Sequence, residues 1–207
     1  MKILKLFIPL IIIAVIFQAC RENDLLETYM LEADQSHLEW KGYTNSYSHI
    51  CTLGVEANDI KVKHGRILSG TLIMPISTLK NLDHQDERHP FIIDYTNSPQ
   101  MLADHPVIIF KIREVTLLSG IHPTAVPGAN WWMRGDMTMW GQTHQISFPA
   151  KIKYIGNDME VEAKFNLDRT YWGMKFGTNP SLEANEMHPI VDLHLKGRGR
   201  INNRLII

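Results

Sequence analysis

The chain has 207 residues, of which 44% are hydrophobic and 21% charged, and its formal net charge is −1. This length and composition are typical of one globular domain with its own apolar core. A nearly neutral chain has neither a basic field for nucleic acid nor an acidic tail, so we expect no nucleic-acid partner.

The first segment has the form of a secretory signal. Two lysines precede an apolar run over 6–17, which is shorter than the about 20 residues that a membrane-spanning helix needs. The sequence FQAC at 17–20 resembles the lipobox of bacterial lipoproteins, in which the cysteine carries lipid. We therefore expect a signal peptide over 1–19 and a lipidated Cys20 that begins a polar tether over 20–36. An ordinary signal peptide with an incidental cysteine is the alternative.

The cysteine count agrees with the lipobox. The chain has two cysteines, so a lipidated Cys20 leaves Cys51 without an intramolecular partner, and no disulfide is expected. Cys51 is then expected to be a small buried apolar residue.

Period-two alternation begins after the tether and predicts strands with one buried face. The first expected strands cover 38–42, 51–63 and 68–76, and His64-Gly65 forms the turn between the last two. Residues 77–106 break the pattern and are the expected helical insert. Within this insert, Ser98 fits an N-cap and Pro99 the first helical position. A further strand is expected over 107–118.

The clearest alternation lies in three runs over 131–140, 143–155 and 159–168. Gly141 and Gly156 lie between these runs, where hairpin turns require positive φ. A last strand is expected over 190–198, after a loop over 178–189. The order predicts an antiparallel meander of about eight strands.

Closing eight antiparallel strands into a barrel removes both unpaired edges. We therefore predict an all-β fold, an eight-stranded antiparallel β-barrel over 37–207 with a short helical insert. The interior of such a barrel is either filled by side chains or holds one small ligand. Both outcomes are compatible with three methionines on one face of the 131–140 strand, because methionine fills cores and also suits a variable apolar guest.

Two motifs carry a family resemblance. MRGDMTMWGQTHQISFPAKI at 133–152 and FNLDRTYWGMKFG at 165–177, supported by Trp40-Lys41-Gly42, DHPVIIF and VDLHLKG, resemble the YceI-like family of bacterial polyisoprenoid-binding proteins over 37–199. The resemblance implies a lipocalin-like barrel that encloses an isoprenoid tail, either a quinone or a polyprenyl chain. It also implies a place in the cell envelope, on the periplasmic side of a membrane. The outer membrane is expected, and surface exposure stays open.

The resemblance assigns roles to residues on the inner faces and at one barrel end. The expected function is that of a carrier, a store or a stress-related lipid-binding protein, with the lipid as its ligand and no further cofactor. The expected barrel-end motif is Asp168, Arg169, Trp172 and Gly173. The expected lumen residues are Ile108, Phe110, Met133, Met137, Met139, Phe148, Ile152, Val161, Phe165 and Leu193.

Other functions have weaker signals. The ten histidines are scattered and include no HExxH, so no metal site is expected. The sequence has no nucleophile elbow and no glycine-rich phosphate loop, and Asp168 with Arg169 fits a structural latch better than a catalytic pair. We therefore expect no enzyme. The alternative to lipid binding is a lipid-anchored interaction module whose barrel is solid.

Overall fold

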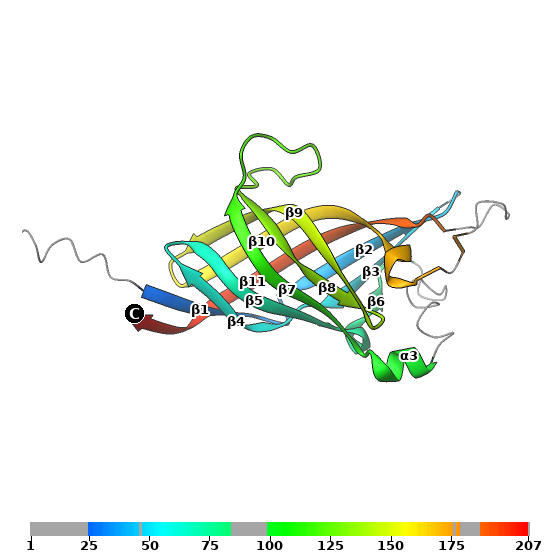
Figure 1. Ribbon diagram of the computed structural model, residues 1–207, viewed down its shortest axis with the longest axis horizontal. Helices are drawn as coiled ribbons and strands as arrows, with labels where there is room; N and C mark the ends of the chain where they lie inside the picture. The colour runs from blue at the N-terminus through cyan, green and yellow to red at the C-terminus, as the bar shows by residue number, and fades with distance from the viewer. Residues whose placement is uncertain (1–24, 46, 84–98, 176, 179–186, 207) are drawn as a thin grey trace, which may run out of the picture.

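The strands of the computed structural model form one antiparallel sheet that closes on itself (Figure 1). The structure describes residues 25–45, 47–83, 99–175, 177–178 and 187–206. Eight strands follow one another around the ring in the order β1-β4-β5-β7-β8-β9-β10-β11, and β11 pairs with β1. The predicted eight-stranded antiparallel barrel is confirmed. The strands are β1 (Leu25–Leu31), β2 (His37–Tyr43), β3 (Ser48–Gly54), β4 (Ala57–Lys63), β5 (Arg66–Pro75), β6 (Lys80–Asn81), β7 (Val107–Leu117), β8 (Trp131–Met139), β9 (Gln142–Ile155), β10 (Asp158–Asp168) and β11 (Ile190–Ile206).

The long strand β11 has two neighbours on the same side. Its residues 199–206 pair with β1 and its residues 192–196 pair with β2. Because β2 pairs with β3 and β1 pairs with β4, the chain from β1 to β4 forms one long hairpin that is broken at 32–36 and 55–56. This hairpin supplies two walls of the barrel along its whole length.

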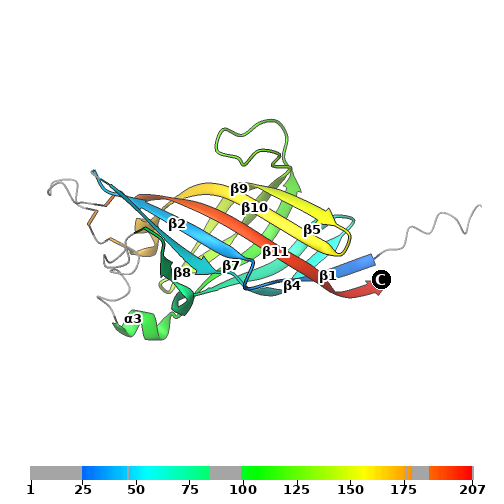
Figure 2. The same ribbon diagram turned by 180° about the vertical axis from the view of Figure 1, so that it is seen from behind.

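The barrel has two ends of different character (Figures 1 and 2). The terminal end carries the start of β1, the end of β11 and the turns at 64–65 and 156–157. The 118–130 loop, between β7 and β8, stands off the side of the barrel. The helix end carries the short helix α3 (Pro99–Asp104), the 3₁₀ turn η2 (Arg169–Trp172) and the turn at 140–141. A further 3₁₀ turn, η1 (Ile76–Thr78), follows β5. No helix in the described part of the chain is long and apolar enough to cross a membrane.

The hairpin turns have the expected backbone. Trp140 and Gly141 have φ of 49° and 72°, and His64 and Gly65 have φ of 50° and 72°. Two successive positive φ angles make turns whose twist matches the flanking strands. Gly156 has φ of 62°. The predicted turns at Gly141 and Gly156 are confirmed.

The expected helical insert is confirmed in part. The helix α3 begins at Pro99, as predicted, and η1 lies at the start of the insert. The expected N-cap, Ser98, and the preceding segment 84–97 lie outside the described residues.

The expected tether is wrong for residues 25–31, which form β1 in the barrel wall between β4 and β11. Tyr29 and Leu31 are buried, but Glu27 lies on the same face and interrupts the apolar pattern. The alternation was therefore hidden by one charged residue. The expected signal peptide and Cys20 lie outside the described residues.

Candidate functional site

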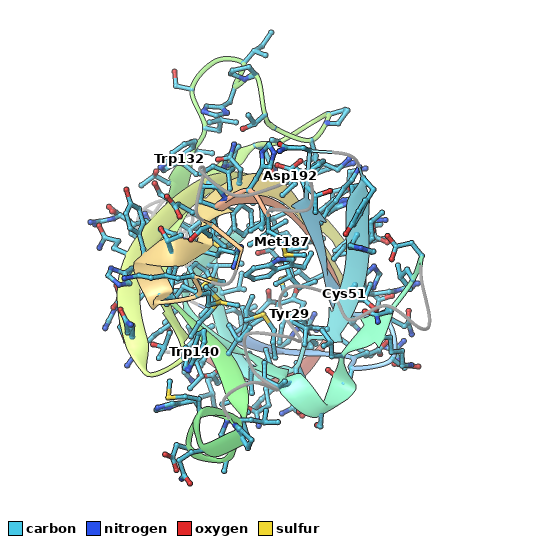
Figure 3. All side chains as sticks on the ribbon, turned by 90° about the vertical axis from the view of Figure 1, so that its right-hand side faces the viewer. Tyr29, Cys51, Trp132, Trp140, Met187 and Asp192 are labelled. Atoms are coloured by element: carbon cyan, nitrogen blue, oxygen red, sulfur yellow. The ribbon has the colours of Figure 1, made fainter. Side chains whose placement is uncertain are left out.

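The inner wall is made by the apolar faces of the strands. The expected lumen residues all come together there, in one cluster of packed side chains. Phe165 is half-buried at the edge of that cluster, and the other nine are at most 8% exposed. Seen from the helix end, the side chains crowd the space within the ring of strands, with Tyr29 near its middle (Figure 3).

A row of aromatic rings crosses the interior. The ring centroids of Phe110 and Phe148 lie 5.5 Å apart, and Phe165 stacks on Phe148 at 4.1 Å. Gly135 makes room for this row, because a Cβ there would lie 2.5 Å from Cζ of Phe110. The Phe110 ring therefore rests against the backbone of β8.

Methionines fill the space beside the aromatic row. Met133, Met137 and Met139 on β8 are at most 2% exposed, and Met159 on β10 is fully buried. Side chains buried to this degree leave no water-sized space beside them. A guest molecule enters this interior only if flexible side chains move aside, and methionine has the three rotatable bonds that such movement needs.

The expected barrel-end residues form a structural latch at the helix end. The Asp168 carboxylate accepts hydrogen bonds from the backbone N–H of Thr170 at 2.9 Å and from its hydroxyl at 2.6 Å, which caps η2. Gly173 ends this turn with φ of 78°. The Trp172 side chain is 1% exposed, and its indole N–H donates to the Met137 carbonyl oxygen at 3.0 Å.

Arg169 points inward and is also 1% exposed. Its guanidinium donates to the carbonyl oxygens of Met174 at 3.0 Å and His188 at 3.4 Å. A buried guanidinium bound to main-chain oxygens holds η2 to the following segment. This arrangement fits the expected structural role.

The terminal end holds a group of polar side chains that sequence reasoning missed. We name Glu27, Tyr29, Tyr154 and Arg204 the polar cluster. Glu27 pairs with Val62 on β4 and with Arg204 on β11, so it shares the inner side with the fully buried Val62. The Tyr29 hydroxyl donates to Glu27 at 3.4 Å, and Nε of Arg204 lies 3.2 Å from Glu27.

The two tyrosines of the polar cluster have perturbed acidities. Burial, and then the Glu27 carboxylate, raises the pKa of Tyr29 to about 12. Burial also raises the pKa of Tyr154, with smaller contributions from Tyr29 and Glu27. Their ring centroids lie 5.6 Å apart. Both tyrosines are therefore neutral hydroxyl groups at physiological pH.

The strand pairing of the barrel wall is interrupted close to the polar cluster, and we name this gap in the pairing the wall opening. Strands β5 and β7 pair only through 70–75 and 107–112. Beyond these residues β5 stays with β4 and β7 stays with β8, so the two hairpins separate at the terminal end. A pocket of about 620 Å³ lies there, lined by Lys63, His64, Arg66, Leu68, Thr116, Leu117 and Trp131. The Tyr154 ring lies under one edge of it, 4.0 Å from the position that a Cβ at Gly65 would take.

The described residues contain neither a metal-binding cluster nor an exposed thiol. In the ranges that the structure describes, no group of three or more His, Cys, Asp or Glu side chains is placed to hold a metal ion. Cys51 is fully buried, and this burial raises the pKa of its thiol. The expectation of a small buried residue is confirmed.

Comparison with known proteins identifies the family. The YceI-like domain matches residues 29–197, which is most of the chain. The chain belongs to the YceI-like family. No curated protein matches this YceI-like chain.

Two solved structures share the fold of this YceI-like barrel. The crystal structure of Burkholderia cenocepacia BcnA aligns with a TM-score of 0.59 and 9% identity, covering 81% of this chain and 98% of its own. A polyisoprenoid binding domain from Saccharophagus degradans, implicated in plant cell wall breakdown, aligns with a TM-score of 0.59 and 8% identity. That alignment covers 84% of this chain and 99% of the domain. At such low identity the likeness concerns the fold.

Proposed function

We propose that this YceI-like barrel binds an isoprenoid-type lipid, a quinone or a polyprenyl chain, between its inner walls and acts as a carrier or store in the cell envelope. The observation that carries the proposal is an inner wall that is apolar through its middle, apart from Ser36, whose hydroxyl donates to the Arg198 carbonyl oxygen, and that is otherwise polar only towards its ends. Among the described residues the buried polar side chains are Ser36, Thr44, His49 and Arg169. Ser36 lies at the break between β1 and β2, and the other three lie at the helix end.

This distribution favours binding over catalysis. An enzyme that acts on a lipid needs polar groups that converge on the reacting bond. The middle of this wall presents Met133, Phe148 and Ile152 instead. The Saccharophagus degradans neighbour, whose fold is shared, is described as a polyisoprenoid binding domain, which supports the same class of ligand.

The energy of binding comes from apolar burial, at about 25 cal/mol for each Å² removed from water. The inner side chains already bury one another, so the protein must lose some of that packing when a lipid enters. Methionine and the half-buried Phe165 give the wall a way to adapt at low cost. A solid interaction module is the second candidate, and the near-complete burial of the inner wall favours it.

The proposed tether fits this geometry. Cys20 precedes Leu25, the first residue of β1 at the terminal end, by five residues. Five extended residues span at most about 18 Å. A lipidated Cys20 would therefore hold the terminal end, with its wall opening, close to the membrane.

Native mass spectrometry of the full-length protein, purified without added lipid, tests the ligand. We expect an adduct with the mass of an isoprenoid lipid in the wild type. Met137→Lys should abolish it, because a buried ammonium must lose its hydration before the lipid can enter. The control is Thr138→Lys on the outer face, where the Thr138 hydroxyl lies 2.8 Å from that of Thr143.

Circular dichroism must first show that both variants are folded. A wild type that carries no lipid and binds no quinone or polyprenyl probe would contradict the proposal and leave the solid module. Unfolding of Met137→Lys alone, together with a lipid-free wild type, would point to the same solid module.

Cys20→Ala tests the tether separately. Two or more acyl chains hold a protein stably at a membrane, whereas one chain binds marginally. We expect the variant to move from the membrane fraction to the soluble fraction. A variant that stays entirely with the membrane would rule out Cys20 as the anchor.

A further inference from the structure

One buried polar atom at the terminal end lacks a hydrogen-bond partner. The Tyr154 hydroxyl is buried and makes no hydrogen bond within the part of the chain that the structure describes. Burying a hydroxyl without a partner costs free energy. A ligand that accepts a hydrogen bond from the Tyr154 hydroxyl would remove this cost.

The neighbours of this hydroxyl are already engaged with one another. Tyr29 donates to Glu27, and Glu27 forms an ion pair with Arg204. Arg204 also donates to the side-chain oxygen of Asn157 at 2.9 Å. The one negative and one positive charge of the polar cluster thus compensate each other, and Tyr154 is left as a neutral donor.

The position of Tyr154 connects it to both the interior and the wall opening. It lies on the inner face of β9, two residues beyond Ile152, and packs against the apolar core. Its ring lies under the β4–β5 turn. His64 of that turn and Arg66, the first residue of β5, line the pocket between β5 and β7. A lipid whose tail lies in the barrel would have its head group close to Tyr154.

We propose that Tyr154 is the head-group site of the barrel, where its hydroxyl donates a hydrogen bond to the oxygen of a neutral head group, either a hydroxyl or a carbonyl. This inference rests on the proposed function, because it assumes that a lipid tail occupies the interior. The neutral class follows from the nearest charges, because Glu27 and Arg204 compensate each other. Lys63 and Arg66 line the pocket farther out, so the proposal requires that the head group stays at Tyr154 and does not reach them. A phosphate would meet the Glu27 carboxylate with no unpaired cation of the polar cluster to offset it.

Three ligands that share the same tail distinguish the contribution of the head group to binding from that of the tail. Farnesol has a hydroxyl, farnesyl phosphate has an anionic head group and farnesene has neither. Binding to the full-length protein can be followed by tryptophan fluorescence, since Trp131 lines the pocket. We expect the wild type to bind farnesol more tightly than farnesene and farnesyl phosphate.

Tyr154→Phe removes only the hydroxyl oxygen. We expect it to weaken farnesol binding by about 2- to 12-fold, the range for one neutral hydrogen bond, and to leave farnesene binding unchanged. It should also raise the melting temperature of the ligand-free protein, because it removes a buried unsatisfied group. Tyr171→Phe is the matched control, since Tyr171 is 65% exposed on η2 at the other end of the barrel.

The outcomes separate the two proposals. An unchanged ratio of farnesol to farnesene affinity in Tyr154→Phe would overturn the head-group site while lipid binding stands. An equal loss of affinity for farnesol and for farnesene would also overturn it. Such a result would show that Tyr154 shapes the tail site and does not bind the head group. Tighter binding of farnesyl phosphate than of farnesol would overturn the neutral class. A wild type that binds neither farnesol nor farnesene would overturn the proposed function together with the site.

Discussion

The packing of the inner wall predicts a specific response to one added methyl group. Gly135 lies on the inner face of β8, opposite Ile112 on β7 and Ile146 on β9. In Gly135→Ala the new Cβ would lie 2.5 Å from Cζ of Phe110 and 2.6 Å from the carbonyl oxygen of Lys111. Unstrained carbon atoms do not approach so closely. The Phe110 ring and the β7 backbone must therefore move.

The cost can be estimated from two opposing effects. Overpacking a dense core costs about 1–3 kcal/mol, and replacing glycine by alanine at a compatible backbone position contributes about 0.4–1 kcal/mol through the unfolded chain. We expect Gly135→Ala to lose about 1–2 kcal/mol. In a domain of 150–250 residues this lowers the melting temperature by roughly 2–8 °C.

Gly197→Ala is the matched control on the inner wall. Its Cβ would meet Cδ1 of Leu31 at 3.4 Å, which is an ordinary van der Waals contact. We expect it to leave the melting temperature unchanged or to raise it slightly, as followed by circular dichroism or calorimetry. If Gly135→Ala proves as stable as Gly197→Ala, the wall beside Phe110 has room for a methyl group. The reasoning from a filled interior would then be refuted.

Three further predictions concern single groups. The hydrogen bond from His194 lowers the pKa of Glu162, so the stability that this carboxylate contributes is present above its ordinary pKa of 4.5 and is lost as pH falls through the lower folded pKa. The urea midpoint of Glu162→Gln should therefore depend less on pH below about 4.5 than that of the wild type. Buried Cys51 should react with a thiol reagent at pH 8 only after unfolding, and rapid labelling of the native protein would contradict its burial. Asp168→Ala removes the cap on Thr170 and should cost about 1 kcal/mol by chemical denaturation, and Asp168→Asn should restore most of it.

Local patterns were sufficient for most of the barrel. Period-two alternation predicted β7 to β10 and the face of each strand that is buried, because burial of one face imposes that period. The turns at Gly141 and Gly156 followed from the need for positive φ. All ten expected lumen residues lie on the inner wall or at its edge for the same reason.

The features that sequence analysis missed depend on pairing between residues that are far apart in the chain. Glu27 interrupts the apolar face of β1, and its charge partner, Arg204, lies 177 residues away. Strand β11 likewise runs to Ile206, beyond the expected end at Arg198, where its residues pair with β1. A shift in register between Thr28 and Tyr29 further disturbs the alternation. No local pattern could show that Glu27 and Tyr154 meet at one end of the barrel.

The two ends of the barrel differ in a way that would orient a lipid bound as proposed. At the helix end Trp172 is buried and bonded to Met137, so the described wall there is filled by a large apolar side chain. At the terminal end β5 and β7 separate beside the polar cluster. An isoprenoid lipid has the same polarity along its length, with one polar head and an apolar tail. The tail would therefore point towards Trp172 and the head group towards Tyr154, and the lipid would enter and leave by the terminal end. That is also the end from which the chain leads to Cys20, so a tethered barrel would present its opening to the membrane that holds its ligand.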